Sequence, residues 1–323
     1  MIYEYLIDPE FLGELAQLPF KHSFFLKQEW GPGTHRFCLR LMEKWDRIPE
    51  KQSLSLKQKV LYEYYVEAVV KRAKIARNME HYDWDGKKEW KENIEAIATS
   101  GKFFPIRMVF TNSVLPMNGV FGVSSLQLMD DNEEAILKLW NSDNSEKKRT
   151  AKEIAGILGL FLCASENIIW IDPYFQDQSR FINVLTGVLA VLSEYSSRYR
   201  SRRTITIVAK YSIRGPKPRD LSSLKAILEG LFAETRLPGT IVKVVFAEDG
   251  SKYKFHDRYM ISELGGILFP GGTDECPDRD VWDLYLMPEE KLNRKRDYYS
   301  HIVTERNWGG EFLRQKEVLV FSM

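Results

Sequence analysis

The chain has 323 residues, of which 44% are hydrophobic and 13% are aromatic, so it can bury a substantial core, and its length favours two domains. With 46 basic and 45 acidic residues the net charge is +1, which excludes a protein that binds nucleic acid through a large overall positive charge. Cys38, Cys163 and Cys276 are widely spaced in no metal-binding pattern, which favours free thiols in a reducing compartment.

The N-terminus has no basic stretch followed by an apolar one, so no secretory signal is expected. The most apolar window, residues 154–164, is shorter than the roughly 20 residues that span a bilayer. We therefore expect a cytoplasmic protein without membrane insertion.

The first part of the chain is predicted to be mainly helical. Thr34 can cap a helix over residues 34–45, residues 56–79 contain no Gly or Pro, and Asp85 can cap a third helix that Gly101 ends. Residues 103–110 are typical of a strand. The polar segment 141–149 is the best boundary, which divides the chain into a helical module, 1–147, for binding a partner or substrate, and a second domain, 148–323.

The second domain alternates between helical and β-branched segments. Helices are predicted over residues 150–164, 177–197 and 220–234, and strands over 167–172, 204–209 and 241–247. Residues 252–262 and 267–269 then form a predicted hairpin around the turn 263–266. This alternation predicts an α/β domain with a sheet that includes parallel strands.

The hairpin contains the residues most suited to chemistry. Because side chains alternate along a strand, His256 and Arg258 are expected on one face, with Asp257 and Tyr259 on the other. A neutral imidazole can attack a phosphodiester, while a guanidinium neutralises charge on the phosphoryl oxygens. Glu263, five residues beyond Arg258, could orient a neighbouring imidazole.

A glycine-rich turn, residues 270–275, follows the hairpin. Its glycines would let backbone amides approach a phosphate, and Thr273 would add a hydroxyl donor. Asp274 either lies near the site or stabilises the turn. Asp172, at the end of a predicted strand, is either a ligand-facing side chain or a carboxylate that caps a turn or helix.

This pattern resembles the phospholipase D superfamily. The family signature is a histidine, one residue, a lysine, four residues and an aspartate, followed by a Gly/Ser turn with an asparagine; here the same spacing gives His256, Arg258 and Glu263, then GGTD. The segment IIWIDPYF (168–175) is similar to a strand-end Asp-Pro-Tyr segment of these domains. The resemblance covers residues 150–323. Arg for Lys and Glu for Asp preserve charge but change shape.

The resemblance implies a mixed sheet flanked by helices and a phosphohistidine intermediate formed with neither metal nor cofactor. A second histidine would protonate the leaving oxygen and then activate water. Since the chain has one such motif, a homodimer that brings two copies of His256 together would complete the site. The alternative donor is His301, on a predicted late helix.

Local basic patches lie at residues 196–203, 213–219, 251–254 and 291–296, and Lys252 and Lys254 are the best candidates for phosphate contacts. These features predict a phosphodiesterase that cleaves DNA or RNA, by analogy one of a bacterial defence system. The alternatives are an inactive module that binds nucleic acid or acidic phospholipid phosphates, and a structural or regulatory subunit.

Overall fold

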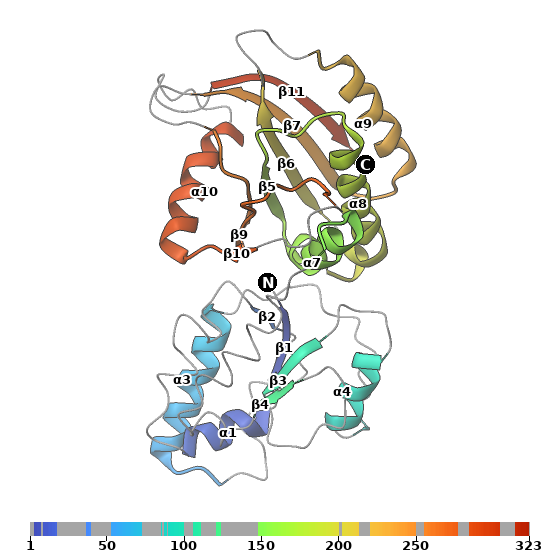
Figure 1. Cartoon of the computed structure of the whole chain (residues 1–323). Coiled ribbons are helices and arrows are strands. Elements are labelled where there is room, and N and C mark those ends of the chain that lie inside the picture. Colours follow the sequence, from blue (N-terminus) through green and yellow to red (C-terminus); the bar gives the residue numbers. More distant parts are fainter. Residues whose placement is uncertain are drawn as a thin grey trace. The chain divides into compact units, whose positions relative to one another are not determined.

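The computed structural model divides the chain into two units, residues 2–143 and 144–323, and each is considered by itself (Figure 1). The sequence-based boundary, between residues 147 and 148, lies four residues beyond this division. The structure describes residues 3–7, 9–17, 37–39, 53–72, 85, 87, 88, 90–99, 106–110, 121–123, 148–199, 202–212, 220–249, 255–276, 284–303 and 314–322.

The N-terminal unit contains a parallel four-stranded sheet of order β2-β1-β3-β4. Its elements are β1 (Tyr3–Ile7), α1 (Pro9–Gln17), β2 (Phe37–Leu39), α3 (Leu56–Arg72), α4 (Trp90–Thr99), β3 (Ile106–Phe110) and β4 (Phe121–Val123). The helices predicted from residues 56 and 85 and the strand near residue 106 are present.

The helix predicted over residues 34–45 is wrong, because Phe37–Leu39 pairs with β1 as strand β2. Phe37 and Leu39 alternate with a residue between them, and pairing with β1 prevails over the weak capping signal of Thr34. A mainly helical module stays a prediction, since much of this unit lies outside the described residues.

The C-terminal unit is an α/β domain built on a mixed seven-stranded sheet of order β10-β9-β8-β5-β6-β7-β11. Its elements are α7 (Ala151–Ala164), β5 (Asn167–Ile171), α8 (Ser179–Tyr199), β6 (Arg203–Lys210), α9 (Ser222–Glu234), β7 (Thr240–Glu248), β8 (Tyr259–Ser262), β9 (Gly265–Leu268), β10 (Tyr285–Leu286), α10 (Glu289–Val303) and β11 (Arg314–Ser322). The predicted α/β class, with a mixed sheet flanked by helices, is confirmed.

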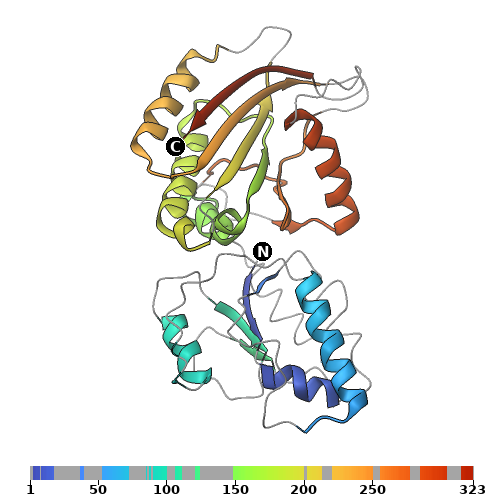
Figure 2. The same ribbon diagram turned by 180° about the vertical axis from the view of Figure 1, so that it is seen from behind.

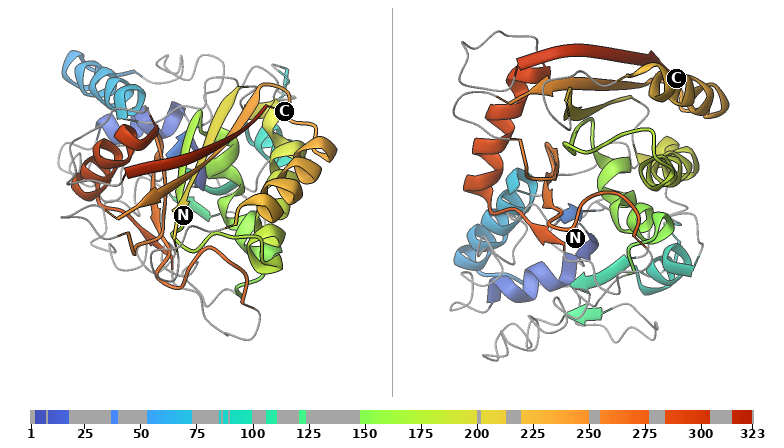
Figure 3. Two further views of the ribbon diagram at one scale, coloured as in Figure 1. Left: turned by 90° about the horizontal axis from the view of Figure 1, so that it is seen from above. Right: turned by 45° about the horizontal axis from the view of Figure 1, so that its top comes forward.

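Strands β5, β6 and β7 are parallel, and the strands that flank them are antiparallel to their neighbours. Helices α7, α8 and α9 cover one face of the sheet and α10 covers the other (Figures 1 and 2). The C-terminal strand β11 forms one edge beside β7 (Figure 3). Its apolar residues were not predicted as a strand.

The core between the sheet and α10 is made of large apolar side chains. Phe255, Tyr259 and Ile261 contribute from the chain around β8, and Leu292 and Tyr299 contribute from α10. Phe255, Tyr259 and Ile261 therefore lie on the α10 side of the sheet. On the other side, Trp170 and Phe175 meet edge to face, with ring centroids 6.2 Å apart. Burial of these rings on both faces fixes the position of the segment between Phe255 and Tyr259.

Candidate functional site

One edge of the seven-stranded sheet collects the polar residues that the sequence singled out. Residue 172 follows the carboxyl end of β5, and β8 begins at the same edge because Tyr259 pairs with Ile171. Strand β9 ends there too, since Leu268 pairs with Tyr259. The loop after β9, residues 269–276, therefore begins beside residue 172. Carboxyl ends of parallel strands are common ligand-binding positions in α/β sheets.

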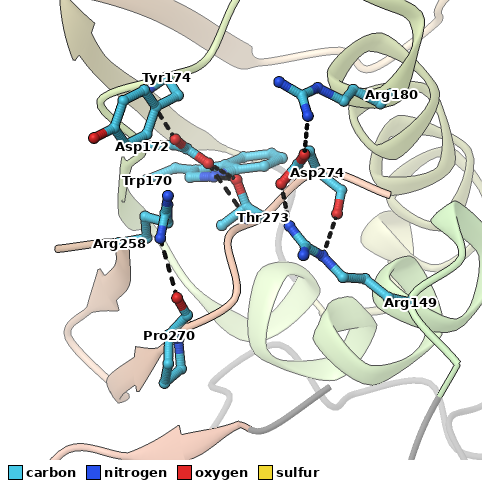
Figure 4. A network of polar contacts seen from close by, with 9 residues as sticks. All are labelled: Arg149, Trp170, Asp172, Tyr174, Arg180, Arg258, Pro270, Thr273 and Asp274. Carbon is cyan, nitrogen blue, oxygen red and sulfur yellow. Dashed lines mark hydrogen bonds and ion pairs between the residues drawn. The ribbon is translucent and has the colours of Figure 1, made fainter. Parts of the chain in front are cut away.

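Asp172 is completely buried at this edge. Its carboxylate accepts hydrogen bonds from the Tyr174 amide at 2.9 Å, from the Thr273 amide at 3.3 Å and from the Thr273 hydroxyl. Thr273 is also fully buried, and its oxygen accepts a hydrogen bond from the Trp170 indole at 3.0 Å. Trp170, Asp172 and Thr273, here called the Asp172 cluster, thus join the end of β5 to the loop after β9 (Figure 4).

Burial raises the pKa of the Asp172 carboxyl above its ordinary value, although the donors from Thr273 and Tyr174 and the charge of Arg258 lower it. Of the two sequence-based readings of this residue, the structure favours the carboxylate that stabilises a turn. The Thr273 hydroxyl was expected to donate to a phosphate, and that expectation is wrong, because the hydroxyl is buried and donates to Asp172. The two residues bond to each other and join the loop after β9 to the end of β5.

Asp274 lies in an ion-pair network beside the Asp172 cluster (Figure 4). Arg149 donates from Nε to the Asp274 carbonyl at 2.7 Å and from Nη2 to its carboxylate, and Arg180 lies 3.2 Å from the other carboxylate oxygen. Of its two readings, the turn-stabilising one is therefore favoured. Neither Arg149 nor Arg180 was predicted from the sequence, because the burial of Asp274, which calls for a cation, is a property of the fold.

Two backbone amides of the glycine-rich turn are bonded within the protein, so these two are not available to hold a phosphate. The Gly272 amide donates to the Phe269 carbonyl at 3.1 Å, and the Thr273 amide donates to Asp172. Gly272 has a φ of +106°, and a Cβ there would lie 2.5 Å from Arg149 Nη2 and from Asp274 Oδ1. Glycine at this position therefore serves the conformation of the turn and the approach of Arg149.

Arg258 is the cation that the structure places at the surface of this site. Its guanidinium stacks over the Tyr174 ring at 5.0 Å and donates from Nη1 to the Pro270 carbonyl at 3.0 Å (Figure 4). Arg258 is half-buried, and Pro270 is its one hydrogen-bond acceptor among the residues that the structure describes. A guanidinium has five N–H donors, so this one keeps donors for a phosphate.

His256 lies two residues before Arg258 and is exposed. Strand β8 begins at Tyr259, so His256 precedes the strand instead of lying within it. Asp257 instead contacts Tyr259 and Lys295 on the α10 side of the sheet, so the expected separation of Arg258 from Asp257 and Tyr259 is confirmed. No side-chain partner of His256 is found within the described part of the chain.

Glu263 is placed away from these residues, and its expected role beside an imidazole is wrong. Its carboxylate accepts hydrogen bonds from the amides of Glu166 and Asn167, at 2.6 and 3.1 Å, at the start of β5. Arg258 and Glu263 flank opposite ends of β8, and a strand rises about 3.3 Å per residue. Five residues along such a chain separate the two side chains by roughly 16 Å.

Lys252 and Lys254, the remaining candidates for phosphate contacts, lie outside the described residues. Among the residues that are described, no group of three His, Cys, Asp or Glu side chains could hold a metal ion. Within the same ranges, no helix has the length and apolar character needed to cross a membrane.

No protein-family model matches the chain, and no curated protein matches it. Among solved structures, it aligns with an archaeal chromatin protein, TrmBL2, whose structure is described as showing a novel mode of DNA binding. The identity is 12%, and the match covers 56% of this chain and 62% of that chain, with a TM-score of 0.25. Backbones that superpose so poorly support no inference about the fold or the function of this chain.

Proposed function

We propose that the C-terminal unit is a phosphodiesterase that cleaves nucleic acid, with His256 as the nucleophile and Arg258 as the ligand of the scissile phosphate. The observation that carries this proposal is the placement of the Arg258 guanidinium. The Tyr174 ring and the Pro270 carbonyl hold it at the edge of the sheet where β5 ends, on the segment that presents an exposed imidazole. Fixed guanidinium groups bind phosphate through paired N–H donors.

In the proposed reaction, an imidazole nitrogen of His256 attacks phosphorus, a P–N bond forms and the bond to the leaving oxygen breaks. A second imidazole gives its proton to that oxygen. It then removes a proton from water, which attacks phosphorus, breaks the P–N bond and regenerates His256. Arg258 stabilises the charge that grows on the phosphoryl oxygens in both steps.

The second imidazole comes from another copy of the chain in this proposal. A twofold axis through the site would bring two copies of His256 to the same phosphorus, each with its Arg258. His301, on α10, is the alternative donor within one chain. An active monomer that loses cleavage when His301 is replaced by alanine would select that alternative.

Cleavage of labelled DNA and RNA in EDTA tests the proposal directly. Wild-type protein should cut one of them, His256→Ala should not, and Arg258→Lys should cut slowly because lysine keeps the charge without the paired donors. Arg236→Lys is the matched control, since Arg236 is exposed beyond α9, before β7. Intact mass should show a phosphorylated adduct in the wild type that His256→Ala lacks.

A binding module without catalysis is the second candidate, and the position of Glu263 favours it. With Glu263 at the far end of β8 and Thr273 buried, His256 and Arg258 are the predicted site residues left to touch a substrate within the described structure. Equal binding of nucleic acid by wild type and His256→Ala, with cleavage by neither, would support this candidate and contradict the phosphodiesterase.

A further inference from the structure

A cluster of three cations on α10 lies next to the segment that bears His256 and Arg258. Lys291, Arg294 and Lys295 are spaced three and four residues apart, so they share one face of the helix. Arg294 is exposed and Lys291 is half-buried, while the Lys295 side chain is 19% exposed. We call these three residues the α10 cations.

The α10 cations adjoin the proposed catalytic segment through Asp257 and Tyr259. The Lys295 ammonium lies 3.8 Å from the Asp257 carboxylate, and the same carboxylate accepts a hydrogen bond from the Tyr259 hydroxyl. The ammonium groups of Lys295 and Lys291 lie 4.8 and 5.9 Å from the centre of the Tyr259 ring. Asp257 is directly between His256 and Arg258 in the chain.

The charges of this cluster are not balanced by its acidic neighbour. Asp257, whose side chain is 61% exposed, is the one acidic residue within ion-pair distance of the α10 cations among the described residues. Burial lowers the pKa of Lys295, Asp257 opposes this shift, and the charges of Lys291 and Arg294 lower the pKa further. An anion bound here would relieve repulsion among the three cations.

We infer that the α10 cations bind backbone phosphates of a polynucleotide whose scissile phosphate lies at Arg258. Arg258 contacts Tyr174 and Pro270, whereas Asp257 and Tyr259 contact α10, so the segment 256–258 has a cation on each side. A nucleic-acid strand that crosses this segment would meet both sets of charges, whereas a small phosphodiester bound at Arg258 is expected to leave the α10 cations without a phosphate. The substrate class is then a polymer with phosphates on both sides of the cleaved bond, an inference that rests on the proposed function.

The test compares Lys291→Gln/Arg294→Gln with a matched control, Lys225→Gln/Arg236→Gln. The control removes one lysine from α9 and one arginine just after it, and its lysine is exposed and paired with Glu229. Lys295 is left unchanged because it packs against Tyr259. Binding of a labelled thymidine oligonucleotide is measured by anisotropy over a series of salt concentrations, and hydrolysis is measured with bis(p-nitrophenyl) phosphate.

Loss of two phosphate contacts on a single strand should reduce the slope of log affinity against log salt by about 1.4, from about 0.7 per contact. At about 0.1 M salt this corresponds to roughly 25-fold weaker binding if affinity at 1 M is unchanged. The control should bind like the wild type, and both variants should hydrolyse the small diester at the wild-type rate.

Three results would overturn the inference. The first is an unchanged salt slope in the α10 variant, and the second is an equal loss with the small diester. The third is tight binding by wild type to phosphatidylserine vesicles without binding to the oligonucleotide. The first and third results are binding measurements that need no catalysis, so failure of the α10 surface can be distinguished from failure of the proposed catalysis.

Discussion

Replacement of Arg149 by alanine should destabilise the C-terminal unit more than any change to the exposed arginines around it. The Arg149 side chain is 4% exposed, and it holds both the carbonyl and the carboxylate of Asp274, whose side chain is 12% exposed. Its own carbonyl accepts the Cys276 amide at 2.8 Å. Arg149→Ala leaves the Asp274 carboxylate buried with a single cation, Arg180.

The magnitude follows from burial of the pair. Breaking a buried ion pair by removing one partner costs about 3–5 kcal/mol, because the other charge stays buried. Since Arg180 still lies 3.2 Å from Asp274, the lower end, about 3 kcal/mol, is expected. In a domain of this size each kcal/mol lowers the melting temperature by about 2–4 °C, so the transition should fall by roughly 6–12 °C.

Calorimetry of the full chain measures this shift, with Arg180→Ala as the control. The Arg180 side chain is 48% exposed, so its ion pair contributes about 0–1 kcal/mol. Arg149→Met combined with Asp274→Leu should recover part of the loss, because it removes both charges together. If Arg149→Ala lowers the transition no further than Arg180→Ala does, the buried pair does not hold the 269–276 loop and the reasoning is refuted.

Gly272→Ala should lower the free energy of unfolding by about 1–3 kcal/mol through backbone strain at positive φ, and by more because its Cβ would lie 2.5 Å from Arg149. In the same calorimetry the control Gly230→Ala, on α9 with nothing near its Cβ, should be neutral or stabilising. Asp172→Asn should change the pH dependence of the urea midpoint, because folding raises the pKa of the Asp172 carboxyl and the folded state therefore binds more protons. The wild type should lose stability relative to the variant as pH rises from the ordinary carboxyl pKa through the raised one. A stability difference that stays constant with pH would contradict this. Glu263→Ala should lower the free energy of unfolding by about 1 kcal/mol, because two amides lose their charged acceptor. Cleavage of nucleic acid by this variant should stay within about twofold of wild type. Loss of cleavage in a folded variant would instead place Glu263 in the active site.

The fold of the C-terminal unit could be predicted where local signals agree with the final packing. Thr150 precedes an apolar helix and has a glutamate three residues later, and in the structure it caps α7 by accepting the Glu153 amide. The β-branched segments 204–209 and 241–247 form β6 and β7. A continuous apolar run is typical of a strand that is covered on both faces, so these two strands could be predicted. These signals are contained within single elements.

The elements that were missed depend on distant partners. Strand β11 pairs with β7, which lies about seventy residues earlier in the chain, and the sequence of β11 itself does not indicate this partner. In the N-terminal unit, Phe37–Leu39 was assigned to a helix, although pairing with β1 makes it a strand. Strand formation is decided by neighbours more than by local preference, which explains these two errors.

The candidate site shows the same division between local and distant information. Arg258 and Asp257 contact different neighbours, as the predicted alternation requires, although both residues precede strand β8. The role of Glu263 was wrong because a spacing of five residues was read as proximity, whereas a strand carries its two ends apart. Arg149 could not be found at all, since 125 residues separate it from Asp274.

Burial now decides which of these residues can act on a substrate. Asp172, Thr273 and Arg149 are buried, and their polar groups bond to one another or to the loop after β9. They can therefore affect the chemistry only through the position of Arg258. Arg258 in turn can bind an anion, but it cannot transfer a proton, because a guanidinium stays protonated. Proton transfer in the proposed reaction therefore falls on imidazoles, and His256 supplies one of the two that are needed. Whether cleavage requires a second copy of the chain is then the same question as where the second imidazole comes from, and a rate per chain that falls on dilution below the dimer dissociation constant would answer both together.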